Sequence, residues 1–356
     1  MSFIERLEAR ENIFLKKLEE CKKSGLKTYI WGNGLTSNFV ELEGNNFKFD
    51  GKLINKSYYS ENSNNIYCFE DIFENTEEKI NLIIGFTKYN DSLIEKYKDK
   101  INLLIDCDCT QNFWLPNNQK LDYSFVINND EKLENIYINL ADEKSKLSLL
   151  AFINQKISKE KKYLKSIYEN NQYFPENIIK LNNNEIFLDC GAYIGDTAKE
   201  FANQIKKQNV TYKKIISFEP NPINFNNLKI TKLNNHECYN IGTSNHKEII
   251  KFSTNTSYSC FDNNGDIKVE VNTIDNVVKD DVTFIKMDIE GMELASLKGA
   301  EQTIKRYKPK LAICIYHKNE DLWEIQNYIK SIVPEYKFYI RAHQEFTLEL
   351  VLYAII

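Results

Sequence analysis

Short apolar runs alternate with amphipathic helical segments along the chain, and this pattern indicates an α/β protein. In the first third, strand-like runs are separated by helix-like pieces, and the alternation predicts a small parallel α/β domain over about residues 26–127. The runs cover residues 27–31, 66–69, 81–85 and 102–106. Before them, residues 2–24 place apolar side chains near one helical face and predict a single amphipathic helix that ends at Gly25.

The middle of the chain has a different pattern. Residues 141–168 are rich in Lys and Glu, have helical periodicity and contain neither Gly nor Pro. They predict one or two helices within a helical linker over residues 128–182. The polar stretch 181–184 is a plausible short boundary, after which a second domain is expected over residues 183–356.

In this second domain the alternation of strand and helix is stronger. Strands are expected at 185–189, 214–219, 237–242, 283–288 and 310–315, and helices at 197–206, 223–233, 292–307 and 321–332. The more polar runs 248–252 and 267–272 predict an inserted hairpin. The runs 336–340 and 349–355 have no helix between them, so we expect a mostly parallel sheet with an antiparallel C-terminal edge.

Composition narrows the classes of function. A length of 356 residues suggests two domains, and the formal net charge of −5 argues against a nucleic-acid partner. No apolar run approaches the roughly 18 residues of a membrane span, and the first ten residues lack the apolar core of a secretory signal. None of the eight cysteines forms a CxxC pair. This favours reduced, buried thiols in a cytoplasmic protein over disulfides or a zinc site.

Candidate chemistry follows the strand ends, because ligands of open α/β sheets bind beyond the carboxyl ends of the strands. The first strand of the second domain ends at Asp189, and Gly191 and Gly195 follow in a G-x-x-x-G spacing. The spacing departs from the dinucleotide pattern G-x-G-x-x-G, and an acid at this point suits a cationic ligand group better than a pyrophosphate. The alternative is an ordinary tight turn between strand and helix.

Two later strand ends also carry acids. Glu219 ends the second strand, where a carboxylate can accept hydrogen bonds from ribose hydroxyls. The alternative is an acid that stabilises a helix N-terminus, with Pro222 early in that helix. Asp288 ends the strand 283–288 and Glu290 opens the following turn, and we expect these two acids to be functional.

Histidine is rare in this chain, which has four, so the position of each is informative. His317 follows the strand 310–315, whose neighbour in the sheet should be the strand that ends at Asp288. We therefore expect His317 to be functional. His343 is a weaker second candidate, and His236 and His246 are expected at the surface.

Three runs together resemble the FkbM-type S-adenosylmethionine-dependent methyltransferases. They are FLDCGAYIGDT at 187–197, SFEPNPINFNNL at 217–228 and FIKMDIEGMELASLKGA at 284–300. Residues 311–329 and 350–354 are similar to one branch of that family. The resemblance covers about residues 173–356, and the motifs occur in the family's order on the expected elements. It implies a class I methyltransferase fold, Rossmann-like, with a mostly parallel seven-stranded sheet and S-adenosylmethionine as the cofactor.

The resemblance also implies roles for individual residues. Asp189, Gly191 and Gly195 would surround the methionine part of the cofactor, and Glu219 would bind the ribose. The full set of expected cofactor-binding residues is Asp189, Gly191, Ala192, Tyr193, Gly195, Asp196, Thr197, Glu219, Pro220, Asn221, Asn240, Gly242 and Asp288. The third strand ends in Asn240-Ile241-Gly242 without the acid that would hold the adenine amino group. Cys260 and Asp262 are weak candidates for that contact.

The expected catalytic residues are Asp288, Glu290 and His317. Because a sulfonium methyl group is already activated, the enzyme must align a nucleophile and remove its proton. His317 would act as the general base, since the ordinary histidine pKa near 6.5 suits neutral pH. Alternatively, the three residues would hold a divalent metal that acidifies the acceptor hydroxyl. Family members commonly O-methylate sugars and secondary metabolites, and the Lys- and Asn-rich composition suits a bacterium that decorates surface polysaccharides.

The N-terminal domain offers a weaker motif. Gly32-Asn33-Gly34 follows the first strand, but Ser37 stands where a dinucleotide motif has its third Gly. The domain is similar to small Rossmann-like domains attached to enzymes of nucleotide-linked sugars, and we expect a scaffold that positions the acceptor or forms a homo-oligomer. Residues 58–59 and 113–116 are candidate stacking surfaces.

Two functions compete with methyl transfer. One is an NAD-dependent sugar oxidoreductase or epimerase that uses the glycine motif of the N-terminal domain. The other is a non-catalytic binding protein on a methyltransferase fold.

Overall fold

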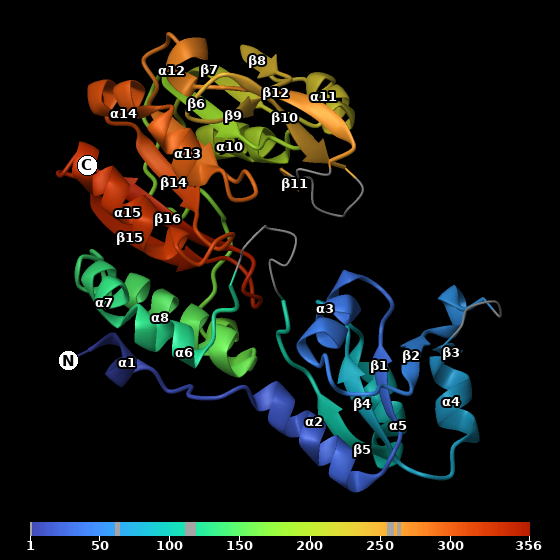
Figure 1. Ribbon diagram of the computed structural model, residues 1–356. Coiled ribbons are helices and arrows are strands. Elements are labelled where there is room, and N and C mark those ends of the chain that lie inside the picture. The colour runs from blue at the N-terminus through green and yellow to red at the C-terminus, as the bar shows by residue number, and fades with distance from the viewer. Residues whose placement is uncertain (1, 61–64, 111–118, 255–259, 262–264) are drawn as a thin grey trace.

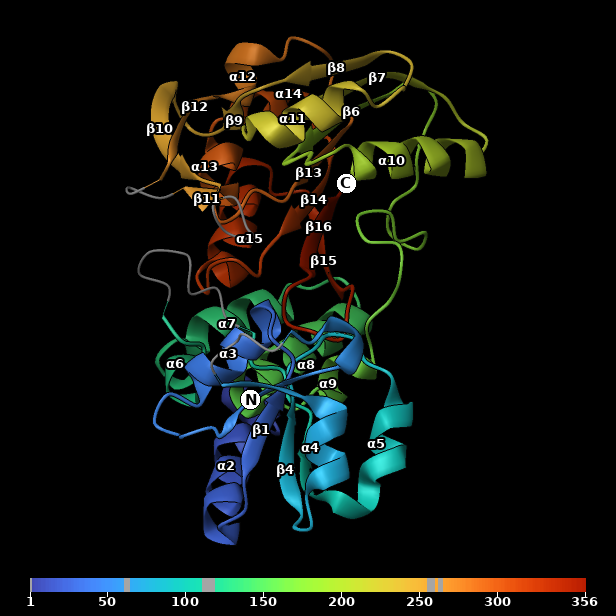
Figure 2. The ribbon, with the colours of Figure 1, turned by 90° about the vertical axis from the view of Figure 1, so that its right-hand side faces the viewer.

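The computed structural model describes residues 2–60, 65–110, 119–254 and 265–356, and the backbone of 260–261. Two α/β parts lie on either side of a group of helices (Figure 1). In the turned view the C-terminal part stands above these helices and the N-terminal part below them (Figure 2). The chain thus places one sheet before the helical segment and a larger sheet after it.

The N-terminal part is built on a five-stranded parallel sheet in the order β3-β2-β1-β4-β5. Its strands are β1 (Thr28–Trp31), β2 (Gly51–Ile54), β3 (Ile66–Cys68), β4 (Ile80–Ile84) and β5 (Ile101–Ile105). Its helices are α2 (Ile13–Ser24), α3 (Leu35–Glu43), α4 (Phe69–Asn75) and α5 (Asp91–Tyr97), with short 3-10 turns at Lys56–Tyr58 and Lys98–Lys100. The predicted parallel α/β domain is confirmed, with β2 as a strand that the pattern did not predict.

The single helix expected over residues 2–24 is wrong, because the chain forms α1 (Phe3–Arg6) and then α2. The break has a local cause. The side-chain oxygen of Asn154 accepts hydrogen bonds from the backbone N–H groups of Glu8 (2.9 Å) and Ala9 (2.8 Å), which a continuous helix would use internally. Helix α1 contacts the helical segment instead, where Arg6 pairs with Glu134 at 2.7 Å.

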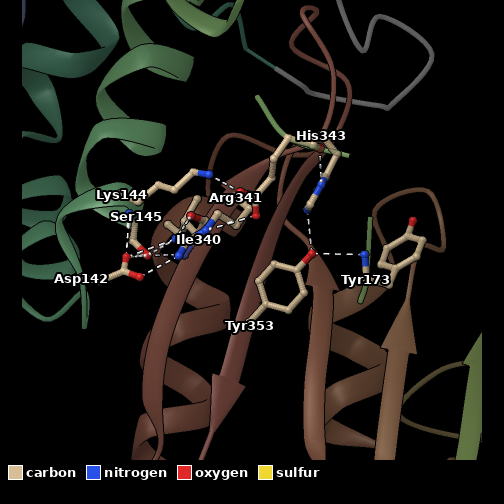
Figure 3. Close-up of polar contacts among 9 residues, drawn as sticks. Asp142, Lys144, Ser145, Tyr173, Ile340, Arg341, His343 and Tyr353 are labelled. Carbon is tan, nitrogen blue, oxygen red and sulfur yellow. Dashed lines mark hydrogen bonds and ion pairs between the residues drawn. The ribbon is translucent and has the colours of Figure 1, made fainter. Parts of the chain in front are cut away.

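The helical segment packs against the edge of the C-terminal sheet. It consists of α6 (Tyr123–Asn128), α7 (Asp130–Ile138), α8 (Glu143–Ser158) and α9 (Lys162–Lys165). At the start of α8, Asp142 accepts two hydrogen bonds from the buried guanidinium of Arg341, at 3.1 and 2.6 Å (Figure 3). Ser145 accepts a third at 2.8 Å. These contacts fix α8 along the strand that carries Arg341.

The C-terminal part contains a seven-stranded sheet in the order β15-β16-β14-β13-β6-β7-β8. The bounds are β6 (Glu185–Cys190), β7 (Tyr212–Phe218), β8 (His236–Tyr239), β13 (Phe284–Met287), β14 (Lys310–Cys314), β15 (Lys337–Ala342) and β16 (Leu350–Ile355). All neighbours are parallel except β16, which is antiparallel to both β14 and β15. The predicted fold class is confirmed, including the antiparallel C-terminal edge.

Helices and a small second sheet complete this part. The helices are α10 (Asp196–Lys207), α11 (Pro222–Lys229), α12 (Ile274–Val277), α13 (Glu293–Lys298), α14 (Glu301–Tyr307) and α15 (Asp321–Ile332). The small sheet has the order β11-β10-β12-β9, with β9 (Gly242–Thr243), β10 (Glu248–Ser253), β11 (Cys260–Phe261) and β12 (Ile267–Asn272). The predicted hairpin is confirmed as the antiparallel pair of β10 and β12.

The helix predicted over 292–307 is two helices, and Gly299 explains the interruption. Its carbonyl accepts a hydrogen bond from the backbone N–H of Asp275 at 3.0 Å instead of continuing the helical pattern. A Cβ atom at this position would stand 2.0 Å from the carbonyl oxygen of Ser244. The chain therefore turns where another backbone approaches it closely.

Two further expectations concern the whole chain. Among the residues that the structure describes, no helix is both long and apolar enough to cross a membrane. The seven cysteines described with their side chains are free thiols, and six of them are buried. This agrees with the expected reduced and mostly buried thiols.

Candidate active site

A pocket of about 310 Å³ opens at the carboxyl ends of the central strands β6, β7 and β13. The chain runs from β6 outward to β7 and β8, and then to β13 on the other side of β6. Ligand crevices form at such switch points of open sheets. The pocket is lined by Gln172, Tyr173, Gly191, Tyr193, Asp196, Thr197, Phe218, Glu219, Pro220, Asn224, Gly242, Thr243, Phe252, Lys286, Asp288, Ile289, Glu290 and Glu349.

The turn after β6 needs its two glycines. Gly191 has a φ of +79°, and a Cβ atom there would stand 1.8 Å from the carbonyl oxygen of Asp288. Gly195 has a φ of +83° and precedes the first residue of α10, and its Cβ would approach Thr231 to 2.9 Å. Both conformations are disfavoured for residues with a side chain. The G-x-x-x-G spacing therefore brings the turn against the end of β13, where the pocket lies.

Glu219 stands at the end of β7 as the sequence predicted. One of its carboxylate oxygens accepts from the backbone N–H of Tyr193 at 2.9 Å, and the other accepts from that of Asn221 at 2.8 Å. Burial raises the pKa of this carboxyl group to about 7, although both hydrogen bonds act in the opposite direction. Glu219 is 5% exposed and lines the pocket, so its carboxylate is held in place where a ligand would bind.

Asp189 has a different surrounding from the one expected. Its side chain is fully buried, and its carboxylate lies 3.1 Å from the Nζ of Lys286. Lys286 also donates to the carbonyl oxygen of Gly191 at 2.9 Å, and it lines the pocket while Asp189 does not. Burial lowers the pKa of Lys286, but the carboxylates of Asp189 and Asp288 raise it by more, so the lysine is a buried cation. Asp189 therefore acts on the pocket through Lys286.

Three other predicted residues brace the loops around the pocket rather than line it. The side-chain amide of Asn240 donates to the carbonyl oxygens of Glu219 (2.8 Å) and Pro220 (3.1 Å). The side chain of Asn221 caps α11. The backbone N–H of Ala192 donates to the carbonyl oxygen of Phe218 at 3.0 Å. Their contribution to a ligand site is to hold Glu219 and the turn after β6.

The end of the pocket near the small sheet is lined by Gly242, Thr243 and Phe252. Gly242 was expected there, whereas Phe252 was not. Of the two weak candidates for an adenine contact, Asp262 and the side chain of Cys260 lie outside the described residues.

His317, Asp288, Glu290 and Glu293 form a cluster beside the pocket. The Nδ1 of His317 lies 2.9 Å from Oε1 of Glu293. Its Nε2 lies 3.5 Å from Oδ1 of Asp288 and 3.5 Å from Oε2 of Glu290. The expected pairing of β13 with β14 brings these residues together. His317 is fully buried, whereas Asp288 and Glu290 line the pocket.

The carboxylates around His317 change its acid–base behaviour. Burial lowers the pKa of the imidazole, but Glu293, Glu290 and Asp288 together raise it to about 10. The structure therefore departs from the ordinary value near 6.5 on which the general-base role was argued. With these carboxylates ionised, the imidazole keeps its proton at neutral pH. The role of general base stays a prediction.

Asp288 is the acid that joins this cluster to the rest of the pocket wall. It accepts from the hydroxyl of Tyr173 at 2.8 Å and from that of Tyr316 at 3.4 Å. Burial raises its pKa, but the charges of Lys286 and His317 lower it by more, so the pKa is below its ordinary value. Asp288 is thus an anion at neutral pH, held between two hydroxyl groups and two cations.

The other three histidines do not line the pocket, and their own surroundings account for their positions. The Nδ1 of His343 lies 3.0 Å from the carbonyl oxygen of Glu169, and its Nε2 lies 2.7 Å from the hydroxyl of Tyr353 (Figure 3). Burial lowers the pKa of His343 to about 4, so it is neutral and structural. His246 is exposed as expected, whereas His236 is half-buried on β8 with Ser217 at 2.8 Å.

The glycine motif of the N-terminal domain has a packing role. Gly32 has a φ of +133°, and a Cβ there would stand 2.7 Å from the carbonyl oxygen of Gly85. Cavities of about 480 and 560 Å³ lie in this domain, but Gly32 and Asn33 line neither. Of the candidate stacking residues, Tyr58 is 82% exposed, and 113–116 lie outside the described residues.

Comparison with known proteins shows which family the region around the pocket resembles. The sequence model of one family, described as a methyltransferase FkbM domain, matches residues 189–345. Residues 189–345 are thus similar to a methyltransferase FkbM domain, and this matched region is called the FkbM domain below. The whole fold is similar to the crystal structure of methyltransferase FkbM from Methylobacillus flagellatus KT, with a TM-score of 0.74 and 22% sequence identity. That similarity covers 98% of this chain and 94% of the other. No curated protein matches the sequence significantly.

The FkbM domain includes every predicted site residue from Asp189 to His317, but part of the pocket wall lies outside its limits. Tyr173 precedes the match, and Glu349 follows it. Glu349 accepts a hydrogen bond from Gln172, and burial raises its pKa to about 8. The local sequence did not indicate that Tyr173 and Glu349 line the pocket, because both lie in loops that precede a strand, β6 and β16 respectively.

Two further residues of the FkbM domain carried a signal that the sequence analysis did not use. Lys286 is a charged residue inside the apolar run of β13, and such a residue needs a buried partner. Glu293 ends the quoted run D-I-E-G-M-E, three residues after Glu290 and five after Asp288. Both residues are essentially buried, and both contact a predicted site residue.

Proposed function

We propose that the chain transfers a methyl group from S-adenosylmethionine to a hydroxyl of a sugar, a nucleotide-sugar or a related small molecule. The observation that carries this proposal is the position of Glu219, whose buried carboxylate lines the pocket and is hydrogen-bonded to the glycine turn after β6. A carboxylate at this strand end suits the two ribose hydroxyls of the cofactor. The FkbM domain supports methyl transfer as the class of reaction.

The pocket residues fit the three parts of this cofactor. Glu219 would accept hydrogen bonds from the ribose. Gly191 lets the turn after β6 lie directly against the end of β13, and the pocket beside this turn would hold the methionine part. Thr243 and Phe252 would contact the adenine, for which a flat apolar surface is suitable. Asn240-Ile241-Gly242 follow β8 in place of an acid, so we propose that Thr243 and Phe252 hold the adenine mainly by shape.

The reaction itself requires alignment and removal of a proton. S-adenosylmethionine supplies a methyl group that is activated by the positive sulfur. The acceptor oxygen forms a bond to the methyl carbon while the carbon–sulfur bond breaks and its electron pair stays on sulfur, so that S-adenosylhomocysteine leaves as a neutral thioether. The hydroxyl proton passes to water. Asp288, Glu290 and Glu349 line the pocket beside His317, so we place the acceptor hydroxyl at this wall. Holding the oxygen in line behind the methyl group is the main contribution expected of the protein.

The biological setting is proposed by analogy with the family. We propose a bacterial, cytoplasmic enzyme of surface polysaccharide or secondary-metabolite biosynthesis, and the free, mostly buried thiols suit a reducing compartment. The N-terminal domain would position the acceptor or form a homo-oligomer.

The oxidoreductase alternative has less support, since packing against Gly85 accounts for Gly32. A non-catalytic binding protein would not need the cluster beside the pocket.

Calorimetric titration with S-adenosylhomocysteine tests the cofactor site. We expect the wild type to bind it and Glu219→Ala to bind at least about tenfold more weakly, because two charged hydrogen bonds to the ribose are lost. Glu237→Ala is the matched control, since Glu237 is an exposed acid on the neighbouring strand β8. NAD is the control ligand. Binding of NAD without binding of S-adenosylhomocysteine would overturn the proposal in favour of the oxidoreductase.

A methyl-transfer assay then tests the acceptor class. The purified protein is incubated with S-adenosylmethionine labelled in its methyl group and with panels of sugars and nucleotide-sugars. We expect label in an acceptor of one of these classes and formation of S-adenosylhomocysteine in equal amount. Cofactor binding without transfer to any hydroxyl acceptor would favour the binding protein instead.

A further inference from the structure

Two carboxylates of the pocket wall, those of Asp288 and Glu349, lie side by side. One oxygen of each lies within 4.8 Å of the other and of the Cys314 thiol. Asp288 follows β13, whereas Glu349 precedes β16. The antiparallel pairing of β16 with β14, which is itself paired with β13, brings the two positions to the same edge of the sheet. The pair therefore stands at the wall where we place the acceptor hydroxyl.

The segment Gln172-Tyr173 holds both acids. The side-chain amide of Gln172 donates one hydrogen bond to Oε2 of Glu349 and one to the hydroxyl of Tyr173, the latter at 2.9 Å. That hydroxyl donates in turn to Oδ2 of Asp288 at 2.8 Å. Both N–H groups of the amide and the hydroxyl proton are thereby used, so the network fixes the orientation of each side chain.

The backbone of this segment is held in an unfavourable conformation. Tyr173 has a φ of +67°, in the left-handed region that bulky residues rarely adopt. Its backbone N–H donates to the hydroxyl of Tyr353 at 3.2 Å, and that hydroxyl lies 2.7 Å from Nε2 of His343 (Figure 3). Strained residues persist where surrounding contacts hold them, and they concentrate at functional sites. Contacts from β16 and from the loop after β15 thus keep Tyr173 where its hydroxyl meets Asp288.

The two acids differ in what surrounds their oxygens. Burial raises the pKa of Asp288, but the charges of Lys286 and His317 lower it by more. Glu349 accepts one side-chain hydrogen bond, from Gln172, and its Oε1 accepts none from the described residues. Desolvation and the charge of Asp288 raise the pKa of Glu349 to about 8, and they outweigh this hydrogen bond and the two nearby cations. Glu349 is therefore the more basic acid, with one oxygen left for a ligand.

From this arrangement we propose that Glu349 is the catalytic base that takes the proton of the acceptor hydroxyl, and that Gln172 and Tyr173 are the residues that position the pair of acids. His317 does not serve in this step, because its imidazole keeps its own proton at neutral pH. The inference deepens the proposed function and rests on it, since it assigns one step of that reaction.

In this step the O–H bond of the acceptor breaks, and its electron pair stays on the oxygen that attacks the methyl carbon. The proton passes to Oε1 of Glu349, which becomes a neutral carboxylic acid. The carbon–sulfur bond breaks with its electron pair on sulfur, which forms S-adenosylhomocysteine. Glu349 then releases the proton to water. A pKa close to the working pH suits a group that takes up and releases a proton in every turnover.

The pH dependence of turnover tests this role. Methyl transfer to the acceptor found in the panels is measured with both substrates saturating, between about pH 6 and about pH 10. In the wild type, kcat should rise about tenfold per pH unit below about pH 8 and level off above it, because only the ionised base accepts a proton. Glu349→Gln should lower kcat about 100-fold or more at pH 8 and lose this rise.

Two further variants test the positioning residues. Gln172→Met removes the hydrogen bond that favours ionised Glu349, so the rise in kcat should move to higher pH by roughly half a unit or more. Tyr173→Phe keeps the ring and should lower kcat about tenfold with little change in KM for S-adenosylmethionine. An unmoved pH profile in Gln172→Met would overturn its positioning role, and an unchanged kcat in Tyr173→Phe would overturn that of Tyr173.

Controls separate this inference from the proposed function. Glu345→Gln changes an acid of the same loop that does not line the pocket, and it should turn over as the wild type does. Titration of each variant with S-adenosylhomocysteine shows that it is folded. A wild type that transfers no methyl group to any acceptor would overturn the proposed function and this step with it. Transfer by folded Glu349→Gln at the wild-type rate, or with the wild-type pH dependence, would overturn the role of Glu349 alone.

Discussion

At the scale of single residues, Glu219 shows how burying a carboxyl group changes its pKa and so the charge of a binding site. The carboxylate is held by two backbone N–H groups, yet removal from water raises its pKa to about 7. The group thus changes its charge close to neutral pH. A ribose-binding carboxylate must accept hydrogen bonds through both oxygens, which only the ionised form does.

We therefore predict that cofactor affinity depends on pH. Below pH 7 a proton competes with the ribose for Glu219, and above pH 7 it does not, so affinity for S-adenosylhomocysteine should rise about tenfold from pH 6 to pH 8. Calorimetric titrations at the two pH values measure this change. Glu219→Gln carries no titrating group and should lose the pH dependence. A dependence that survives in this variant would assign it to another residue.

His317 gives a second prediction at this scale. We expect His317→Ala to lower turnover about 100-fold or more, because it removes the buried cation that Asp288, Glu290 and Glu293 surround. Affinity for S-adenosylhomocysteine should change little, because the imidazole is buried behind Asp288 and Glu290 rather than in the pocket wall. Initial rates at saturating cofactor and acceptor measure the effect. Turnover close to that of the wild type would contradict any catalytic role for this residue.

The sequence correctly predicted that several residues at strand ends lie together beside one pocket. Gly191, Glu219 and Asp288 each follow an apolar run, and the register of a parallel sheet brings such positions to one edge. The contact of Asp189 with Lys286 was not predicted, because Lys286 lies in another strand and only the pairing of β6 with β13 brings the two together. A contact across strands leaves no mark in the local pattern.

At the scale of elements, the contact of α8 with β15 depends on one buried cation. Arg341 is 1% exposed and is bound by Asp142 and Ser145 at the start of the helix. Burial raises the pKa of Asp142, but the hydrogen bonds from Arg341 and Ser145 lower it by more, to about 2. The folded state therefore favours the ionised carboxylate.

We predict that Asp142→Ala destabilises the protein by about 3 kcal/mol at pH 7, since it leaves a buried guanidinium without its main partner. The ordinary pKa of Asp is 3.8, so the stabilisation is complete above about pH 4 and is lost as pH falls through 2. Urea unfolding at pH 7 and pH 3 should give a smaller difference between variant and wild type at the lower pH. Glu143→Ala, at a side chain that is 79% exposed, should be neutral.

Elements with a clear apolar period were predicted close to their observed bounds, and the helix at Asp321–Ile332 was predicted without error. The failures have one cause. The helices expected over 2–24 and 292–307 are interrupted where a distant group binds their backbone, namely Asn154 in the first case and Asp275 in the second. Periodicity reports which face is apolar, but it does not report a competing hydrogen bond.

At the scale of the whole molecule, Asp108 joins segments from three parts of the chain. Its carboxylate accepts from the side chain of Gln155 on α8 at 2.8 Å and from the backbone N–H of Thr347 at 2.9 Å. Asp108 follows β5 of the N-terminal sheet, and Thr347 precedes β16 of the C-terminal sheet. The sequence predicted two α/β parts, but nothing in it indicated this joint, since its members are up to 239 residues apart.

We predict that Asp108→Ala lowers the free energy of unfolding by on the order of 3 kcal/mol, because it leaves buried donors on two other segments without an acceptor. Urea unfolding followed by tryptophan fluorescence measures this loss. Asp99→Ala removes an exposed acid from the N-terminal part and should change stability little. Equal stability of the two variants would indicate that the parts are held together by apolar contacts alone.

The position of β16 between β14 and β15 has a consequence for folding during synthesis. The strands β6, β7, β8, β13 and β14 can pair as soon as they leave the ribosome, but β15 joins the sheet only through β16. Until β16 is synthesised, one edge of β14 has no paired strand. The strand β15, against which α8 packs, is then not yet part of the sheet. The same late step brings Glu349 to the pocket. The nascent chain therefore has most of its sheet before it has a complete ligand site, and the exposed edge of β14 is where a chaperone would be needed.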